Sequence, residues 1–246
     1  MPLKASPDAQ SQLLELQAID IRLQQLDHSA KTVPELAVLA ELSATHEQVQ
    51  RELMSVTGSL EDAKLELGRV EGDVAVVEGR IARDVARLDV SSSVKDVAGL
   101  ESELSGLRNR QLELEEVELE VMERVEGLET TLAALRADSE EVQGKIAAAE
   151  VERDSALAAL NSERAHSVAN RSVIAGKLPE ELLALYERQR DRYGFGASHL
   201  RGGVSSASGV KLNESDMAVI RAAAPDDVLL CPDSNAILVR TGESGL

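Results

Sequence analysis

The residues with the clearest chemical spacing lie near the C-terminal end of the chain. Two residues separate Ser205 from Ser208, and Cys231 and Ser234 repeat that spacing after 22 intervening positions. A cysteine at all four positions would give the spacing of a zinc ribbon, in which two tight turns close four thiolates around the metal. Serine hydroxyls do not ionise near neutral pH and are poor zinc ligands. The pattern therefore indicates a vestigial metal site, and neither zinc nor another cofactor is expected.

Other catalytic chemistry has little support in the sequence. There is no glycine-rich phosphate loop and no nucleophile motif, and the histidines stand singly, at His28, His46, His166 and His199. Cys231 follows Leu229 and Leu230, so a buried apolar side chain is favoured over a reactive thiol, which would need neighbours that lower its pKa. The chain is not expected to be an enzyme.

A group of basic residues near the C-terminal end could contact nucleic acid, with Tyr193 or Phe195 available for stacking on bases. The candidates are Arg188, Arg190, Arg192, Arg201 and Lys211. The alternative is a solvated helix end, where cations interact favourably with the helix dipole. Glu187 flanks the run and Asp191 interrupts it. The formal net charge of the chain is −18, which argues against nonspecific attraction to phosphate.

Composition indicates long helices for most of the chain. Only three residues are aromatic although 43% are hydrophobic, and no proline occurs in residues 35–178. An ordinary globular core uses many aromatic side chains, and a disordered chain has fewer apolar ones. No apolar run is long enough to cross a bilayer, and the first residues lack an apolar signal core, so a cytoplasmic protein without membrane contact is expected.

Hydrophobic periodicity predicts an antiparallel coiled-coil hairpin over residues 6–176. Alternating steps of three and four residues run from Leu39 to Ile81, with His46 as the one polar seam position. A second array follows from Leu100 to Leu160, interrupted at the seam by Gln111, Glu118, Ser139 and Arg153. The tip is expected near residues 89–95, where Ser93 and Asp96 form a helix-start signal. Pairing within one chain and pairing between two chains both fit, which leaves self-association open.

The N-terminal part of this hairpin is expected to form a separate segment. Ser6 is a suitable N-cap and Pro7 suits the first helical position, whereas Pro34 clashes with a helix that continues behind it. A kink near residues 31–34 is therefore predicted. Residues 8–30 should then pack beside the C-terminal end of the second arm.

A linker helix over residues 177–194 is predicted to start with Pro179 at its first position and to end near Tyr193 and Gly194. Residues 195–246 form a small domain, in which Asn213 should cap a helix that runs through Ala223. Its apolar side chains are expected to pack against a cluster of Tyr186, Tyr193 and Phe195: Leu212, Met217, Val219, Ile220, Val228, Leu229, Leu230, Ile237, Leu238 and Val239.

Three stretches together carry a family resemblance: Lys95–Leu104 after the tip, Lys177–Glu187 in the linker, and Cys231–Arg240 at the end. They are similar to the bacterial C4-type zinc ribbon proteins with an N-terminal coiled coil, formerly a domain of unknown function. The resemblance implies a coiled-coil hairpin followed by a ribbon head. It also implies protein partners in regulation and export in motile bacteria, and a role in nucleic-acid binding that is often predicted. Zinc belongs to the family pattern, but Ser205, Ser208 and Ser234 cannot be carried over as ligands.

These observations predict a mainly α protein: a long antiparallel coiled-coil helical hairpin and a small C-terminal zinc-ribbon-like α+β head over residues 195–246. The function expected first is that of a non-enzymatic adaptor or chaperone, which binds protein partners through the coiled coil and the metal-free head. The alternative is a nucleic-acid-binding protein that acts through the head.

Overall fold

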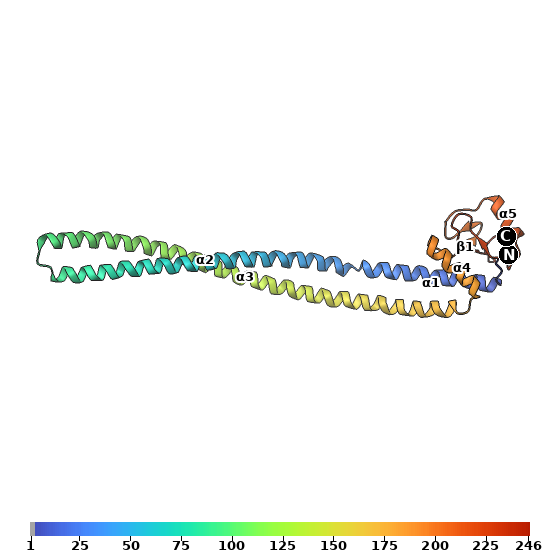
Figure 1. Ribbon diagram of the computed structural model, residues 1–246, viewed down its shortest axis with the longest axis horizontal. Helices are drawn as coiled ribbons and strands as arrows, with labels where there is room; N and C mark the ends of the chain where they lie inside the picture. Colours follow the sequence, from blue (N-terminus) through green and yellow to red (C-terminus); the bar gives the residue numbers. More distant parts are fainter. Residues whose placement is uncertain (1–2) are drawn as a thin grey trace. The chain divides into compact units, whose positions relative to one another are not determined.

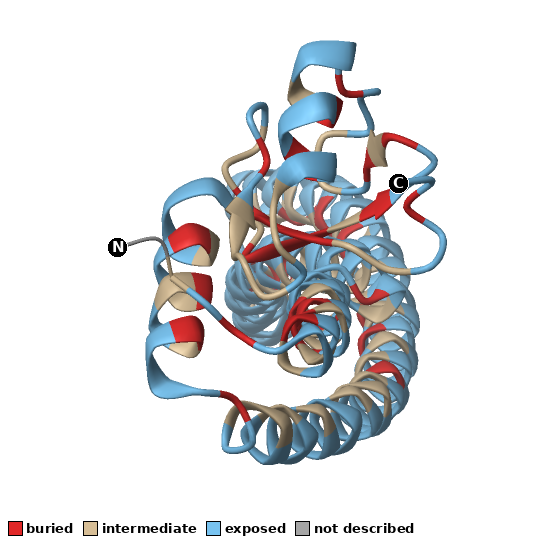
Figure 2. Ribbon diagram, turned by 90° about the vertical axis from the view of Figure 1, so that its right-hand side faces the viewer, coloured by how far each residue is buried: buried red, intermediate tan, exposed pale blue. Residues whose placement is uncertain are grey.

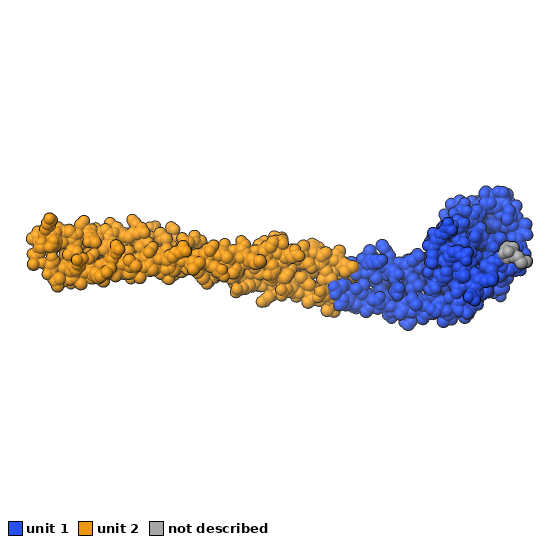
Figure 3. Space-filling view, viewed as in Figure 1, with its two compact units in different colours: residues 1–34, 152–246 blue, residues 35–151 orange. Residues whose placement is uncertain are grey.

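The computed structural model describes residues 3–246, and most of them are helical (Figure 1). The elements in chain order are α1 (Pro7–Lys31), α2 (Pro34–Val90), α3 (Val94–Ala175), α4 (Glu180–Tyr193), β1 (Ala197–Arg201), β2 (Val204–Ser205), α5 (Glu214–Ala222), β3 (Leu229–Leu230) and β4 (Ile237–Val239). Two compact units divide the chain (Figure 3): residues 35–151 form one, and residues 1–34 with 152–246 form the other. The prediction of a mainly helical chain with a coiled-coil hairpin and a small C-terminal sheet is confirmed.

The unit of residues 35–151 is an antiparallel pair made by α2 and the first part of α3 (Figure 1). Its buried apolar residues fall on the predicted seam: Leu60, Ala63, Val70 and Val77 on α2, and Leu104, Leu114, Val121, Leu132 and Ala149 on α3. Lys64 pairs with Glu129 across the helices at 2.6 Å, and Arg124 pairs with Glu66. In this structure the seam therefore closes between two helices of the same chain.

Polar residues form one layer of this seam. Ser139 is buried, and the side-chain amide of Gln50 donates a hydrogen bond to its hydroxyl at 2.9 Å. His46 Nε2 lies 3.1 Å from Gln143 Nε2 in the same region. A buried polar group needs a partner, and only a matching register supplies one, so this layer favours a single alignment of the two helices.

Within the other unit, α1 packs along the last part of α3, as the sequence predicts. Arg22 pairs with Glu163 at 2.5 Å, and Arg164 pairs with Asp27 at 2.8 Å. The Ser6 hydroxyl accepts a hydrogen bond from the amide of Ala9, which confirms the predicted N-cap. The helix ends at Lys31, and α2 begins at Pro34.

The C-terminal region carries a four-stranded sheet in the order β2-β1-β4-β3. Strands β1 and β4 are parallel, and the other two pairs are antiparallel. Asn213 caps α5 through the amide of Asp216, and α4 ends at Tyr193, both as predicted. Gly194, which follows, has the left-handed conformation. The predicted place of Pro179 is wrong by one residue: its ψ of 136° is extended, so it is the N-cap of α4 and not its first helical residue.

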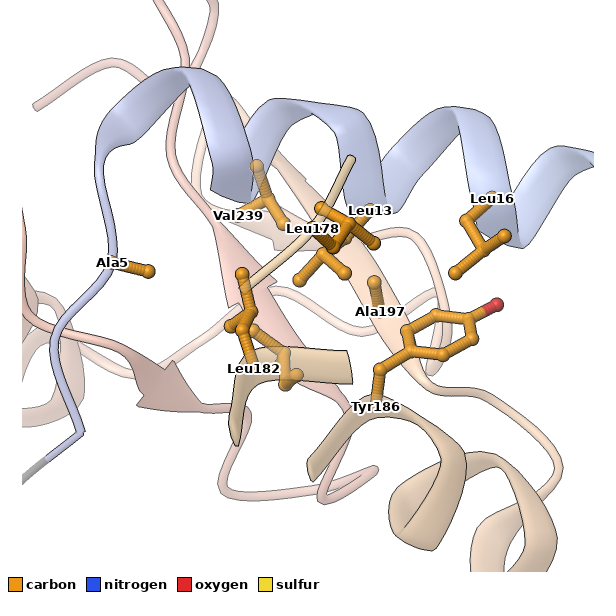
Figure 4. Packing of buried hydrophobic residues seen from close by; sticks show 9 residues of the cluster. Ala5, Leu13, Leu16, Leu178, Leu182, Tyr186, Ala197 and Val239 are labelled. Atoms are coloured by element: carbon orange, nitrogen blue, oxygen red, sulfur yellow. The ribbon is translucent and has the colours of Figure 1, made fainter. Parts of the chain in front are cut away.

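Two apolar clusters cover this sheet, and they correct the predicted core. Tyr186, Leu182 and Leu178 pack with Leu13 and Leu16 of α1 and with strand residues including Val239 (Figure 4). The second cluster contains Leu200, Leu212, Met217, Ile220, Cys231 and Leu238. Figure 2 shows that burial is concentrated at the sheet and the elements that contact it.

The predicted aromatic cluster does not form. Of the three aromatic residues only Tyr186 is fully buried, whereas Tyr193 is exposed because it lies at the end of α4. Val219 and Leu230, also predicted to be core residues, are exposed as well. Leucines of α1 supply the apolar surface that was predicted to come from aromatic neighbours.

Replacing Gly196 by alanine is expected to destabilise the head, because a Cβ at this position would overlap the ring of Tyr186. Overpacking of a full core of this kind costs about 2 kcal/mol or more of unfolding free energy. Urea unfolding followed by circular dichroism measures the loss. Gly242→Ala is the matched control, since no atom lies within 4 Å of its Cβ position. Equal stability of the two variants would show that the ring is not fixed against Gly196.

Candidate functional site

The two pairs predicted from their spacing lie on turns with the same hydrogen bonds. In the first turn the amide of Ser205 donates to Val210 O at 3.1 Å, and its carbonyl accepts from Gly209 N at 2.8 Å. In the second, the amide of Cys231 donates to Ala236 O at 2.8 Å, and its carbonyl accepts from Asn235 N at 2.9 Å. Gly209 and Asn235, each four residues after the first member of its pair, both have positive φ. The two turns are therefore equivalent in backbone geometry.

The second members of the pairs are equivalent too. Ser208 Oγ accepts a hydrogen bond from the amide of Val210 at 3.3 Å, and Ser234 Oγ accepts one from the amide of Ala236 at 3.4 Å. In both cases the donor lies two residues farther along the chain. Each of these two serine side chains therefore stabilises the turn in which it lies.

Ser205 and Cys231, the first members of the two pairs, are in contact in the buried space between the turns. Cys231 Sγ donates to Ser205 Oγ at 3.3 Å, and Ser205 Oγ lies 2.7 Å from the hydroxyl of Ser198. All three side chains are buried. Burial alone would raise the pKa of the Cys231 thiol, but hydrogen bonds with Ser205 and Ser234 outweigh it and hold the pKa below its ordinary value.

These residues do not fit a zinc ion. The donor set is one thiol and three hydroxyls, and each of the three hydroxyls already takes part in a hydrogen bond within the head. Within residues 3–246, no group of three or more histidine, cysteine and acidic side chains could hold a metal ion. The Ser205–Cys231 contact is instead a small hydrogen-bonded core.

The candidate nucleic-acid contacts have different surroundings in the structure. Arg190 is half-buried and pairs with Asp20 at 3.0 Å, and Arg201 pairs with Glu243 at 2.6 Å. Arg192 lies over the ring of Tyr193, 5.3 Å from its centre. Arg188 and Lys211 are exposed. Carboxylates thus neutralise two of the five cations that the sequence grouped together.

Asp20, a carboxylate of α1, is buried, and the sequence pattern did not predict it as a functional residue. Arg171 of α3 donates to its two oxygens at 2.6 and 3.2 Å, and Tyr186 and Arg190 of α4 donate at 2.7 and 3.0 Å. Burial alone would raise the pKa of Asp20, but these hydrogen bonds outweigh it and hold the pKa below its usual range. Burial and the neighbouring Asp20 raise the pKa of Tyr186, so its hydroxyl stays protonated.

Gln17, one turn before Asp20, extends the connection to the sheet. Its side-chain oxygen accepts hydrogen bonds from the amides of Gly196 and Ala197 at 2.8 and 3.1 Å. One signal in the sequence could have revealed these contacts. Steps of three and four from Leu13 and Leu16 reach Asp20 and Leu23, so the carboxylate stands on the apolar stripe of α1 and not on its solvated face.

Asp20→Asn is expected to lower the unfolding free energy at neutral pH by about 3 kcal/mol, because two arginines lose their buried counter-charge. Because the pKa of Asp20 is lower in the folded state, its ionised carboxylate stabilises the fold at pH values above the unfolded-state pKa. This stability is lost as the pH falls through the folded-state pKa. Urea unfolding from neutral pH to about pH 2.5 should therefore show a smaller acid-dependent loss in the variant.

The control for this substitution is Asp27→Asn. Asp27 also pairs with an arginine of α3, but half of its side chain is exposed, so a change below about 1 kcal/mol is expected. An Asp20 variant that follows the wild-type pH profile would contradict the role given to the buried carboxylate.

Known proteins resemble this chain over nearly its whole length. It is 33% identical over 239 residues to the uncharacterized protein Rv2229c of Mycobacterium tuberculosis, a match that covers 97% of this chain and 98% of the relative. A solved structure from Mycobacterium smegmatis is 34% identical and superposes with a TM-score of 0.88, covering 97% of this chain and all of the other.

A more distant structure, that of CT398 from Chlamydia trachomatis, has the same fold. It is 19% identical, with a TM-score of 0.70 over 94% of this chain and 97% of its own. Residues 16–194 match the family described as the CT398-like coiled coil hairpin domain. The matched range covers α2, α3 and α4, and it includes Asp20, Arg171 and Tyr186. By this match and by the fold, the chain belongs to the CT398-like coiled coil hairpin domain family.

Proposed function

We propose that this protein is a non-enzymatic adaptor or chaperone that binds protein partners through the outer faces of its coiled coil and through its small head. We also place it in the cytoplasm, where a single reduced thiol such as Cys231 persists. The observation that carries the proposal is that α2 and α3 close their seam within one chain and leave large apolar side chains on their outer faces. Exposed apolar groups gathered on a polar surface are a common mark of protein-binding surfaces.

The chemistry of the head supports the same proposal. The buried polar side chains Cys231, Ser205, Ser198 and Asp20 are engaged in hydrogen bonds that hold the fold together. Their hydrogen bonds supply a structural role for each of them. The head is then available to a partner as a surface and not as a reaction centre.

We further propose that the head is a zinc ribbon that has lost its metal. The support is the pair of equivalent turns, whose hydrogen bonds and positive φ positions repeat at Ser205 and at Cys231. Two equivalent turns that approach each other are what a four-ligand zinc site requires. In this chain the hydrogen bonds of Ser198, Ser205 and Cys231 and the apolar residues around them replace the stabilisation that zinc would supply.

Two metal analyses test this reading of the head. The purified chain is expected to carry less than about one zinc per ten molecules, because its hydroxyls bind the ion poorly. Ser205→Cys, Ser208→Cys and Ser234→Cys combined should restore about one zinc per molecule. Retained stoichiometric zinc in the wild type, or a triple variant that folds without binding zinc, would contradict the proposal.

Cross-linking in the native cell tests the adaptor role. A photoreactive amino acid at an exposed position of the coiled coil, such as Leu65, or of the head, such as Leu230, is expected to give discrete adducts with other proteins. The same amino acid at the buried seam position Leu60 is the control and should give adducts within the chain only.

The alternative function, nucleic-acid binding by the head, is an outcome of the same experiment. Exposed Arg188, Arg192 and Lys211 are the remaining candidate contacts, since the other two are paired with carboxylates. Adducts with RNA or DNA at position 192, together with none to protein at positions 65 and 230, would overturn the adaptor proposal.

A further inference from the structure

An apolar strip lies on the outer face of α3, away from the seam. It consists of Leu112, Leu119 and Met122, whose exposed fractions are 64%, 62% and 48%. Leu112 and Leu119 are seven residues apart, so two helical turns bring them onto one line, and Met122 lies on the adjacent turn beside it. Leu114 and Val121, each two residues beyond a leucine of the strip, are buried in the seam on the opposite side. The strip therefore takes no part in closing the hairpin.

The surroundings of the strip are strongly acidic. Residues 112–126 contain seven glutamates and one arginine. Glu115 and Glu126 lie within the strip by their helical positions, and Glu116 and Glu123 flank it. The one arginine, Arg124, pairs with Glu66 of α2.

Most of this negative charge is not neutralised by the chain itself. Across the described part of the chain, residues 3–246, no lysine or arginine forms an ion pair with five of the glutamates: Glu116, Glu118, Glu120, Glu123 and Glu126. Four of these five side chains are exposed. Like charges this close on one helix repel each other, and a cationic partner would relieve the repulsion.

Apolar side chains at helical spacing with acidic groups around them match one class of ligand. A helix with leucines along one face and lysines or arginines beside them would cover the strip and place its cations on the glutamates. A second copy of the chain would bring two acidic strips together, and nucleic acid or an anionic membrane would be repelled in the same way. We propose that Leu112, Leu119 and Met122 form a docking surface for a basic amphipathic helix of a partner protein. The inference rests on the proposed adaptor function and names the chemistry of one partner.

Fluorescence anisotropy with the full chain tests this proposal. The probe is a labelled synthetic helix of about three heptads with leucine at the a and d positions and lysine elsewhere. Leu112→Ser, Leu119→Ser and Met122→Ser combined are expected to weaken binding at least about tenfold, because the apolar contact is lost while every charge is kept. Glu116→Gln with Glu123→Gln should weaken binding and reduce its dependence on salt.

The matched control is Met54→Ser, Leu65→Ser and Val76→Ser on α2, where the same chemical change removes three side chains that are 71%, 62% and 56% exposed. It should leave the affinity within about twofold of wild type. Circular dichroism of each variant should show unchanged helix content, since neither set contributes to the seam.

Three results would overturn the inference: no binding of the probe to the wild type, equal weakening by the two sets of serine substitutions, or equal binding of a probe whose leucines are replaced by serine. The last result would show attraction by charge alone. None of these three results contradicts the adaptor proposal, which the cross-linking experiment tests separately. If no exposed position gave protein adducts in that experiment, the adaptor function itself would be contradicted.

Discussion

The buried carboxylate of Asp20 is the interaction on which the arrangement of the head depends. Three elements meet at this one side chain, because Arg171 of α3 and Tyr186 and Arg190 of α4 all donate to it. A carboxylate removed from water is costly unless its oxygens are fully engaged, and here four hydrogen bonds engage them. Gln17, one turn from Asp20 on α1, accepts hydrogen bonds from the amides at the start of β1 and so connects this strand to the same helix. The head is thus built on α1 and the end of α3, and not on the C-terminal residues alone.

This arrangement explains how a small sheet is stable without a metal. Strands of two to five residues bury little surface by themselves. Leu13 and Leu16 of α1 and Leu182 of α4 supply the missing apolar surface, and hydrogen bonds among Ser198, Ser205 and Cys231 fill the space between the two turns. The coiled coil of residues 35–151 is held by different means, through its own apolar seam and the polar layer at Ser139.

The sequence predicted the features that depend on local periodicity and on capping. The steps of three and four located the seam, and Ser6, Asn213 and Gly194 marked helix ends, because a cap acts within a few residues of itself. The two turns at Ser205 and Cys231 were marked by spacing, although the sequence alone did not reveal that their hydrogen bonds match. The partners of Asp20 could not be predicted, since they lie about 150 residues away in the sequence. Tyr186 was assigned to an aromatic cluster because its true neighbours, leucines of α1, are equally distant.

The most direct test of this account is a double-mutant cycle between Asp20 and Arg171. Unfolding free energies of Asp20→Ala, Arg171→Ala and the double variant yield the energy that couples the two side chains. A buried, bidentate pair predicts a coupling of about 2 kcal/mol or more at neutral pH, with a smaller value below the pKa of Asp20. A coupling near zero at neutral pH would contradict the central role given to this carboxylate.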